Sequence, residues 1–406
     1  MNKIELLSPA GSVNKLITAV DFGADAVYIG GKSFGLRVAS ENASFEELKE
    51  GIEYAHKQNV KVYITCNIVA RNNEMRSFPL FLNQLVQAKA DAVILTDLGM
   101  FKAVRENAPQ MEIHLSTQAN VTNYEACNFF HSLGAKRIVL ARELSLSEIK
   151  DIRENTKKDL ELEAFVHGAM CVSYSGRCLL SNYMTGRSAN SGHCAHPCRW
   201  KYSLVEEKRP NEYYPVYEDE EGTFIMNSKD LCMIGHIKEL YEAGISSFKI
   251  EGRVKSEYYV ATVTGAYRNA IDEFLRDGRF YTFNQKWFDE ICKVSHRDYY
   301  TGFYLGELEG QIYNTSSYIR ECDMIAIVED FDEQTGMALC RHKNRFKVGD
   351  KIEVLEPKNN YFQMTIHDIL DEEYHNLSEA LHPQMLVWIT MPKAVKIGTI
   401  LRRNKE

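Results

Sequence analysis

Phe22-Gly-Ala-Asp-Ala-Val-Tyr-Ile-Gly30 carries the clearest fold signal in the chain, because its pattern recurs three more times. A helix ends at a small residue, and a short apolar strand follows at once. The other copies are Ala88-Lys-Ala-Asp-Ala-Val-Ile-Leu-Thr-Asp97, Leu133-Gly-Ala-Lys-Arg-Ile-Val-Leu-Ala-Arg142 and Ala243-Gly-Ile-Ser-Ser-Phe-Lys-Ile-Glu251. Glycine at a helix C-terminus accepts the left-handed conformation, and a continuous apolar run is typical of a buried parallel strand. Each copy therefore predicts a junction from a helix into a buried strand.

Four further strands are predicted in the gaps between these copies. They are Ile4–Leu7, Val60–Thr65, Glu112–Ser116 and Leu160–Val166. Most of the eight strands precede a helical stretch, and repeated strand-then-helix units give a parallel sheet with right-handed crossovers. Eight such units predict an α/β fold of the TIM-like (βα)8 barrel type. An open, doubly wound sheet is the alternative, because closure cannot be read from sequence.

The alternation of strands and helices is interrupted at two places in the chain. Residues 170–223 contain four cysteines with Gly and Ser, and we predict a Cys-rich insertion after the seventh strand, on the face where barrel enzymes place their active sites. Beyond Cys322 the pattern changes to short alternating strands, which is typical of a small β-barrel. We therefore predict two domains, a barrel at residues 1–315 and a C-terminal β-barrel domain at residues 316–406.

The composition limits the expected partners and location. The 406 residues carry a formal net charge of −8, so any contact with RNA would need local basic patches, such as 341–347 and 402–405. These two segments are equally well explained as solvated faces. The opening MNKIELLSPAG is too short for a signal peptide, and no stretch of 18 apolar residues follows. We expect a cytoplasmic protein with no membrane partner, whose ten cysteines are not a disulfide set.

Polar side chains follow several predicted strands, and a barrel would bring these strand ends to one mouth. The candidate substrate-binding residues are His114, Gln118, Asn120, Arg142, Glu143, His167, Glu251 and Arg253. Each could be a simple loop or capping residue, and it is their recurrence that favours a site. Arg142 and Arg253 could grip a carboxylate or phosphate through bidentate hydrogen bonds. Structural ion pairs with Glu143 and Glu251 are an equally good interpretation.

Four cysteines lie in the insertion rather than on apolar faces of strands or helices. Cys171 and Cys178 form one pair and Cys194 and Cys198 the other, and two close pairs at loop positions suit a site of four thiolates. The gaps of six, fifteen and three residues differ from the Cys-x2-Cys pairs of zinc ribbons, which favours an iron–sulfur cluster over zinc. Cys232 is an alternative fourth ligand, although its predicted helical context favours a core thiol.

The stretch Glu163-Ala-Phe-Val-His-Gly-Ala-Met-Cys-Val-Ser-Tyr-Ser-Gly-Arg-Cys-Leu-Leu-Ser181 resembles the signature of the peptidase U32 family. Other blocks similar to that family are Glu5-Leu-Leu-Ser-Pro-Ala-Gly11, His114-Leu-Ser-Thr-Gln-Ala-Asn120, Arg142-Glu-Leu144, Met226-Asn-Ser-Lys-Asp-Leu231 and Lys249-Ile-Glu-Gly-Arg253. The likeness runs to about residue 315, and the β-rich region beyond it resembles the family's C-terminal domain.

This resemblance implies an iron–sulfur enzyme that hydroxylates RNA without O₂, although the family name records an older assignment as collagenase-like peptidases. The length and the second domain look most like the tRNA branch, which implies formation of 5-hydroxyuridine at the wobble position with prephenate as co-substrate. By the same likeness, Cys171, Cys178, Cys194 and Cys198 would hold a [4Fe–4S] cluster. The implied partners are tRNA, a small anionic co-substrate, and an electron donor or a second U32-family protein.

Three other functions stay open on the sequence. The first is hydroxylation of ribosomal RNA, as in another branch of the family. The second is a peptidase, for which the chain offers neither H-E-x-x-H nor G-x-S-x-G, but only a thiolate at Cys171 near His167. A cluster on the four cysteines would leave none of them as a nucleophile. The third is a non-catalytic iron–sulfur subunit that binds RNA or passes electrons to another protein.

Overall fold

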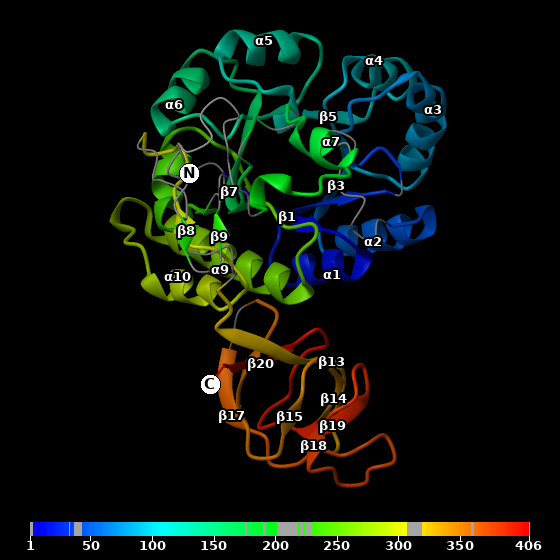
Figure 1. Ribbon diagram of the computed structural model, residues 1–406, viewed down its shortest axis with the longest axis vertical. Helices are drawn as coiled ribbons and strands as arrows, with labels where there is room; N and C mark the ends of the chain where they lie inside the picture. Colours follow the sequence, from blue (N-terminus) through cyan, green and yellow to red (C-terminus); the bar gives the residue numbers. More distant parts are fainter. Residues whose placement is uncertain are drawn as a thin grey trace, which may run out of the picture.

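The structure is a computed structural model, and it describes residues 3–31, 33–35, 43–171, 173–174, 177–187, 189, 192–200, 218–219, 222–223, 229–306, 319–358 and 361–405. Helices ring a set of strands in the upper part of Figure 1, and a β-rich C-terminal domain lies below α9 and α10. The predicted domain boundary at residue 315 lies outside the described residues, as does most of the predicted insertion beyond residue 200.

Eight parallel strands of the described chain close into a barrel. They are β1 (Glu5–Ala10), β2 (Ala26–Gly30), β3 (Lys61–Cys66), β4 (Ala92–Leu95), β5 (Glu112–Leu115), β6 (Arg137–Val139), β7 (Glu161–Ala169) and β11 (Ser247–Ile250). β1 pairs with β2 on one side and with β11 on the other, and β11 also pairs with β7. The predicted TIM-like barrel is therefore confirmed, and the open sheet is excluded.

Helices follow the barrel strands and cover their outer faces. They are α1 (Val13–Asp21), α2 (Phe45–Lys57), α3 (Asn72–Gln87), α4 (Leu98–Asn107), α5 (Tyr124–Ser132), α6 (Leu146–Glu154), α8 (Ile237–Glu242) and α9 (Glu257–Asp277). Asp97 Oδ1 caps α4 by accepting hydrogen bonds from the backbone N–H groups of Gly99 at 2.8 Å and Met100 at 3.1 Å. After α1, Gly23 takes φ +99°, the left-handed conformation that the recurring motif predicts. None of the described helices has the length and apolar character that crossing a membrane requires.

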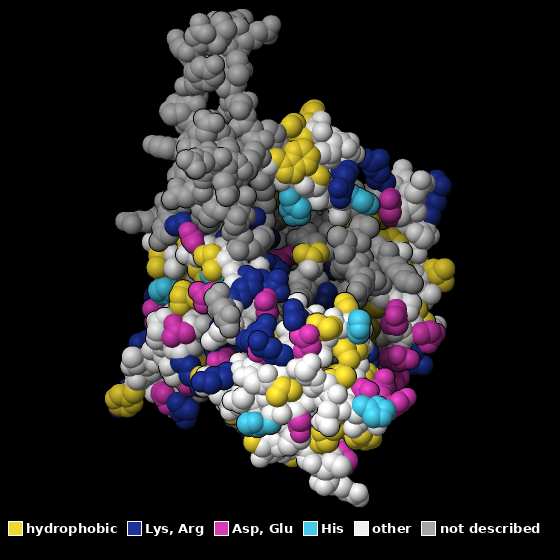
Figure 2. Space-filling view, turned by 60° about the horizontal axis from the view of Figure 1, so that its bottom comes forward, with side chains coloured by type: hydrophobic (Ala, Val, Ile, Leu, Met, Phe, Trp, Pro, Cys, Tyr) yellow, Lys and Arg dark blue, Asp and Glu magenta, His cyan; other side chains and the backbone are white. Residues whose placement is uncertain are grey.

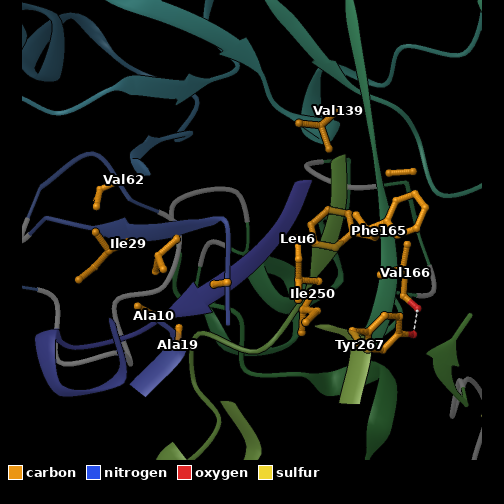
Figure 3. Packing of buried hydrophobic residues seen from close by; sticks show 14 of the residues in the cluster. Leu6, Ala10, Ala19, Ile29, Val62, Val139, Phe165, Val166, Ile250 and Tyr267 are labelled. Atoms are coloured by element: carbon orange, nitrogen blue, oxygen red, sulfur yellow. Dashed lines mark hydrogen bonds between the residues drawn. The ribbon is translucent and has the colours of Figure 1, made fainter. Parts of the chain in front are cut away.

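The main apolar core lies between the strands and the outer helices. Leu6, Ile29 and Val166 of the strands are completely buried there, together with Ala19 of α1 and Tyr267 of α9 (Figure 3). The Tyr267 hydroxyl donates to the backbone oxygen of Val166 at 2.8 Å, so the one polar atom of this ring is satisfied. Burying one such aliphatic side chain contributes about 1.5–3 kcal/mol to stability.

The C-terminal domain is an antiparallel half-barrel. Its six-stranded sheet has the order β17-β16-β20-β13-β14-β19. The strands are β13 (Cys322–Asp332), β14 (Met337–His342), β16 (Lys351–Leu355), β17 (Tyr361–Thr365), β19 (Leu386–Thr390) and β20 (Ile400–Asn404), beside a two-stranded ribbon of β15 (Phe346–Lys347) and β18 (Glu379–Ala380). The short strands predicted beyond Cys322 are confirmed. The end strands β17 and β19 do not pair with each other in the described part of the chain, so the sheet is half of a barrel.

Arg402 of β20 joins the two domains. Its side chain is 0% exposed, and its guanidinium donates to Glu290 of α10 (Gln285–Cys292) at 2.9 Å and to Glu353 of β16 at 2.8 Å. Lys293 Nζ also donates to Glu353 at 2.8 Å. A buried charge with several partners fixes one docking geometry, because any other arrangement would leave it unpaired.

The arginines of both predicted basic segments are paired with acids. Arg341 Nε donates to Glu329 at 2.7 Å, and Arg345 Nε donates to Glu379 at 2.9 Å. On the face drawn in Figure 2, Lys and Arg side chains gather near the centre with acidic side chains among them. Within the candidate basic patch at residues 402–405, Arg402 cannot contact RNA and does not lie on a solvated face, because the domain interface buries it.

Candidate active site

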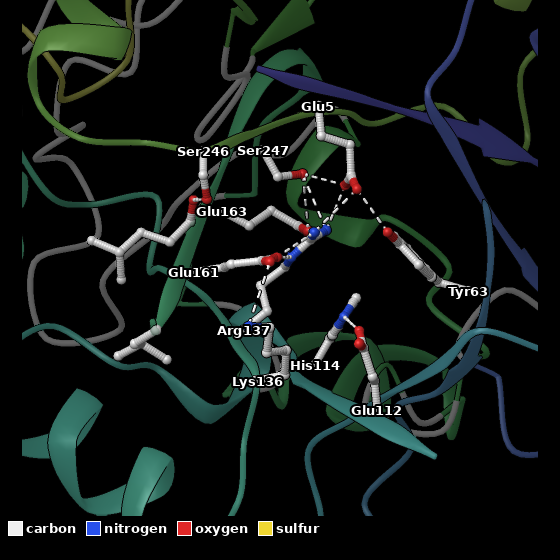
Figure 4. A network of polar contacts seen from close by, with 12 residues as sticks. Glu5, Tyr63, Glu112, His114, Lys136, Arg137, Glu161, Glu163, Ser246 and Ser247 are labelled. Atoms are coloured by element: carbon white, nitrogen blue, oxygen red, sulfur yellow. Dashed lines mark hydrogen bonds and ion pairs between the residues drawn. The ribbon is translucent and has the colours of Figure 1, made fainter. Parts of the chain in front are cut away.

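A buried ionic network fills part of the barrel interior below the mouth. Arg137 of β6 donates to Glu161 at 2.6 Å and to Glu163 at 3.0 Å, both on β7 (Figure 4). Glu5 of β1 also pairs with Arg137, and it accepts a hydrogen bond from the Tyr63 hydroxyl at 2.7 Å. These residues face inward because alternate side chains of a barrel strand point to its interior. Each charge has an opposite charge beside it, which burial requires.

The network favours the ionised form of Glu5 and of Glu163. Burial by itself would raise the pKa of Glu5, but the Arg137 guanidinium outweighs it and holds that pKa at about 2. Burial also opposes ionisation of Glu163, and Lys249 followed by Arg137 lowers its pKa. Lys249 Nζ donates to Glu163 Oε1 at 2.7 Å. A chain of ion pairs therefore runs from the amino-terminal end of the barrel to Lys249, near the carboxyl end of β11.

Aromatic rings and cations meet in the buried interior, beside the carboxyl-terminal parts of the strands. Lys249 Nζ lies 4.6 Å from the ring centroid of Tyr28 and 5.3 Å from that of Phe165. The guanidinium carbon of Arg142 lies 4.4 Å from the same Phe165 ring centroid. Sequence reasoning missed Lys249, Tyr28 and Phe165, although charged residues at alternate positions of a buried strand, as in Ser247-Phe-Lys249-Ile-Glu251, are a signal for an inward-facing polar row.

Arg253 adds a further cation on the neighbouring side of the mouth. Its side chain is 4% exposed, and its Nη1 donates to the Thr65 hydroxyl at the end of β3 at 2.7 Å. Burial is the main cause of the lowered pKa of Lys249, and the positive charge of Arg253 acts in the same direction. Arg142, Lys249 and Arg253 thus place three cations near the mouth, beside the rings of Phe165 and Tyr28, and Lys249 is paired with Glu163. Such a site suits an anionic ligand.

The other predicted substrate residues divide between the mouth and the interior. Gln118 and Asn120 follow β5, and Glu143 and Glu251 follow β6 and β11. Burial raises the pKa of Glu143. The structure places His114 below the mouth rather than at it, because this residue faces inward from the middle of β5. Its ring is 0% exposed, and the ring centroid lies 4.5 Å from that of Tyr63.

His167 lies in a cage of tyrosines on the outer side of β7. Its ring centroid is 6.0, 5.5 and 5.2 Å from those of Tyr259, Tyr267 and Tyr299. Burial, followed by the charge of Lys255, lowers the pKa of His167 to about 3. Neither ring nitrogen has a hydrogen-bond partner within the described residues. A histidine held neutral in this way is a poor base, so the geometry does not favour the thiolate–imidazole pair of a peptidase.

We expect His167 to make the protein less stable in mild acid. Because the folded pKa of about 3 lies below the ordinary value of 6.5, the unfolded chain takes up a proton that the folded chain does not. The stabilisation is complete above pH 6.5 and is lost as the pH falls toward 3. Between pH 7 and pH 5 the loss amounts to about 2 kcal/mol. Urea titrations at these two pH values should show a smaller acid loss in His167→Phe than in the wild type, and equal losses would contradict this account.

The predicted cluster ligands lie in the segment that leaves the barrel after β7. Cys171 is exposed, and Cys178, Cys194 and Cys198 are half-buried. Thiols in such positions can reach a metal, whereas a deeply buried core thiol stays protonated and inert. Four thiol ligands are therefore chemically suited to a soft metal ion or an iron–sulfur cluster.

Two hydrogen bonds organise the second cysteine pair. The Ser181 hydroxyl, on α7 (Leu180–Thr185), accepts from the backbone N–H of Ala195 at 3.0 Å and so joins the stretch after Cys178 to the one that contains Cys194. The backbone N–H of His196 donates to Cys194 Sγ at 3.4 Å, which orients this sulfur. Across the described ranges, no three His, Cys, Asp or Glu side chains converge closely enough to hold a metal ion. The ligand set therefore stays a prediction.

Cys232 occupies a different environment. It ends the short strand β10 (Asp230–Cys232), which pairs antiparallel with the end of β7 and sets Cys232 opposite His167. The predicted helical context is wrong, because the helical pattern begins only after this strand. Its side chain is 7% exposed in the main core, and burial raises the pKa of its thiol to about 12. These properties favour a core thiol over a metal ligand.

An open pocket of about 600 Å³ lies beside the first cysteine pair. It is lined by Asn120, Thr122, Ser173, Tyr174 and Arg177. Arg177 Nε donates to Asn120 Oδ1 at 2.7 Å, and this bond ties the loop between Cys171 and Cys178 to the residues that follow β5. The pocket therefore lies at the rim of the barrel mouth.

Comparison with known proteins places the chain in a family. Residues 11–313 match the sequence model of Peptidase family U32. Residues 320–402 match the model of the Peptidase family U32 C-terminal domain. The chain belongs to peptidase family U32. This U32 chain is 40% identical over 405 residues to a protein of Bacillus subtilis named tRNA hydroxylation protein P1, across 99% of this chain and 95% of that one.

Two further relatives carry other names. An uncharacterized protease of Methanocaldococcus jannaschii is 43% identical over 364 residues, which is 87% of each chain. A 23S rRNA 5-hydroxycytidine synthase of Escherichia coli is 36% identical over 276 residues, which is 68% of this chain and 40% of that protein. The names of the relatives thus include tRNA hydroxylation, rRNA hydroxylation and proteolysis.

Proposed function

We propose that this chain hydroxylates RNA without O₂, and that its product is 5-hydroxyuridine at the wobble position of tRNA. The observation that carries the proposal is the 40% identity, over 99% of the chain, to a protein named for tRNA hydroxylation. That likeness spans both domains, so it includes the barrel mouth and the Cys-rich segment together. The arginines Arg142 and Arg253 and the aromatic rings near the mouth support the proposal, because they suit an anionic co-substrate beside a planar base.

The cofactor we propose is a [4Fe–4S] cluster on Cys171, Cys178, Cys194 and Cys198, with zinc as the alternative. A bound cluster would supply the electron transfer that ordinary side chains cannot. The proposal rests on the position of these thiols in one segment at the mouth and on the Ser181 hydrogen bond that joins its two halves.

The side chains of the mouth would bind and orient the substrates. Arg142 and Arg253 would grip the carboxylates of a small anion, which we propose is prephenate, and Lys249 would add positive charge from below. Phe165 and Tyr28 would exclude water and strengthen these ion pairs. On the rim, the side chains that would meet the base are those of Gln118, Asn120, Glu143 and Glu251.

Arg253→Ala is expected to weaken binding of the anionic co-substrate. A charge-assisted hydrogen bond contributes roughly 1.5–3 kcal/mol, which corresponds to a loss of affinity on the order of tenfold to a hundredfold. Arg253→Lys should rescue only part of this, because a point charge cannot reproduce a planar fork. Calorimetric titration with prephenate would measure the effect. Equal affinity of Arg253→Ala and the wild type, with equal cluster content, would remove Arg253 from the site.

The reaction product distinguishes tRNA hydroxylation from two other functions. Hydroxylation of ribosomal RNA is favoured by the name of the E. coli relative, and a peptidase by the name of the M. jannaschii protein. Mass spectrometry of nucleosides from the tRNA and rRNA of a deletion strain tests the proposal. Loss of 5-hydroxyuridine and its derivatives from tRNA supports it, whereas loss of a hydroxylated cytidine from rRNA supports the first alternative.

A further inference from the structure

Residues 171–200 differ in charge from the rest of the chain. This stretch contains three arginines and two histidines but neither Asp nor Glu, in a chain with 56 acidic residues and a net charge of −8. Arg177 and Arg187 are exposed. The arginines of the C-terminal domain, such as Arg341, are instead paired with acids. The local charge of residues 171–200 therefore complements a polyanion that the chain as a whole repels.

The same stretch exposes large apolar side chains. The exposed fractions are 83% for Tyr183, 54% for Leu179, 48% for Met184, 46% for Tyr174 and 41% for Trp200. Exposed apolar side chains that gather in one place mark a binding surface. Aromatic faces beside arginines are the means by which proteins stack unpaired bases and contact the phosphates between them. An A-form duplex would offer no exposed base faces to these rings.

The pocket at the mouth rim connects this surface to the site. Tyr174 and Arg177 form part of its lining, and its volume of about 600 Å³ is of the size that holds a small planar ligand. The Arg177–Asn120 hydrogen bond fixes the pocket against the end of β5. A nucleotide in the pocket would lie between the predicted cluster ligands Cys171 and Cys178 on one side and the barrel mouth on the other.

We propose that Tyr174, Arg177, Tyr183, Arg187 and Trp200, named here the stacking surface, receive the unpaired nucleotides of the RNA loop that carries the reactive base. This inference deepens the proposed RNA hydroxylation and rests on it. Tyr174 and Arg177 hold one nucleotide at the pocket. Tyr183 and Trp200 stack on bases that flank it, and Arg187 contacts a phosphate. The occupant is single-stranded RNA, because the surface combines aromatic faces with positive charge and lacks acids.

Fluorescence anisotropy with an anticodon stem–loop RNA, on the anaerobic holoprotein, tests the stacking surface. Tyr183→Ala and Trp200→Ala are each expected to raise Kd by about tenfold, and Tyr183→Phe to retain the wild-type Kd. Phe280→Ala is the matched control, because Phe280 is an aromatic residue that is 75% exposed and lies outside the surface. The guanidinium carbon of Arg279 lies 4.7 Å from its ring centroid. Iron content equal to that of the wild type shows that each variant is folded.

The salt dependence of binding tests the charge. Arg187→Ala should reduce the slope of log Kd against log salt concentration by about 0.7, the value for one phosphate of a single strand. Arg341→Ala should leave the slope unchanged, because Arg341 already pairs with Glu329. A slope in Arg187→Ala equal to that of the wild type would overturn the assignment of Arg187.

Three other results would overturn the stacking surface. They are wild-type Kd values in both Tyr183→Ala and Trp200→Ala, equal competition by an RNA duplex, and loss of binding to a protein partner in these variants while RNA binding persists. Failure of the proposed function would look different. In that case the tRNA nucleosides of the deletion strain would be unchanged. If only this inference failed, the deletion strain would lose the hydroxylated nucleosides, and Tyr183→Ala and Trp200→Ala would restore them fully.

Discussion

Protein purified without air is expected to carry roughly four iron atoms per chain, and the Cys171→Ala variant to carry almost none. The reason is that a four-thiolate site that loses one ligand holds its cluster weakly and exposes it to solvent. Iron assay and visible absorbance of the anaerobic protein measure the effect. One equivalent of zinc with no iron would show that the site is a zinc site.

Other cysteines provide the controls for this experiment. Cys292→Ala should keep its iron, because Cys292 is half-buried like three of the predicted ligands but lies on α10. Cys232→Ala should also keep it, since its thiol is part of the core. Loss of iron in Cys232→Ala, with iron retained in Cys198→Ala, would mean that β10 rather than the second cysteine pair supplies the fourth ligand.

Arg137→Ala is expected to lower the free energy of unfolding by about 3–5 kcal/mol, because it leaves Glu5 without its main partner and leaves the buried Glu163 with Lys249 alone. Glu163 is completely buried, and Glu5 owes its low pKa to this guanidinium. Urea denaturation at neutral pH measures the loss. At lower pH the difference should shrink, since the stability that Glu5 gains from its pKa of about 2 is present above the ordinary value of 4.5 and is lost as the pH falls toward 2.

Lys102→Ala is the control for the Arg137 experiment. Lys102 forms an ion pair with Glu106 on the surface of α4, where the two side chains are 75% and 60% exposed. Such a pair contributes about 0.2–1 kcal/mol. If Arg137→Ala cost no more than Lys102→Ala, the interior network would not hold the barrel together.

The barrel could be predicted because its signals are local. A small residue followed by an apolar run, as at Gly23 and at Gly244, fixes both a helix end and the next strand, and both glycines take a positive φ in the structure. The capping side chain of Asp97 is another local signal, since it bonds to groups two and three residues away. Strand positions in the C-terminal domain were predictable for the same reason, from short alternating runs.

The interior of the site could not be predicted because its partners are distant in sequence. Arg137 and Glu5 are 132 residues apart, and Arg253 reaches Thr65 across 188 residues. Alternation along a strand shows which side chains face inward, but it does not show which of them meet. His167 follows the rule of a polar residue near a strand end, yet tyrosines of α9 and β12 (Tyr299–Tyr300) enclose it. The positions of Arg142 and Arg253 at the mouth agree with their predicted location, and their role there stays a prediction.

We propose that this U32 chain hydroxylates tRNA and is not a peptidase. Mass spectrometry of tRNA nucleosides from a deletion strain, complemented with either the wild-type protein or Cys171→Ala, tests it most directly. We expect 5-hydroxyuridine and its derivatives to fall in the deletion strain, to return with the wild type and not to return with Cys171→Ala. Unchanged tRNA nucleosides in the deletion strain, together with cleavage of denatured collagen by the purified protein and its loss in Cys171→Ala, would contradict the account.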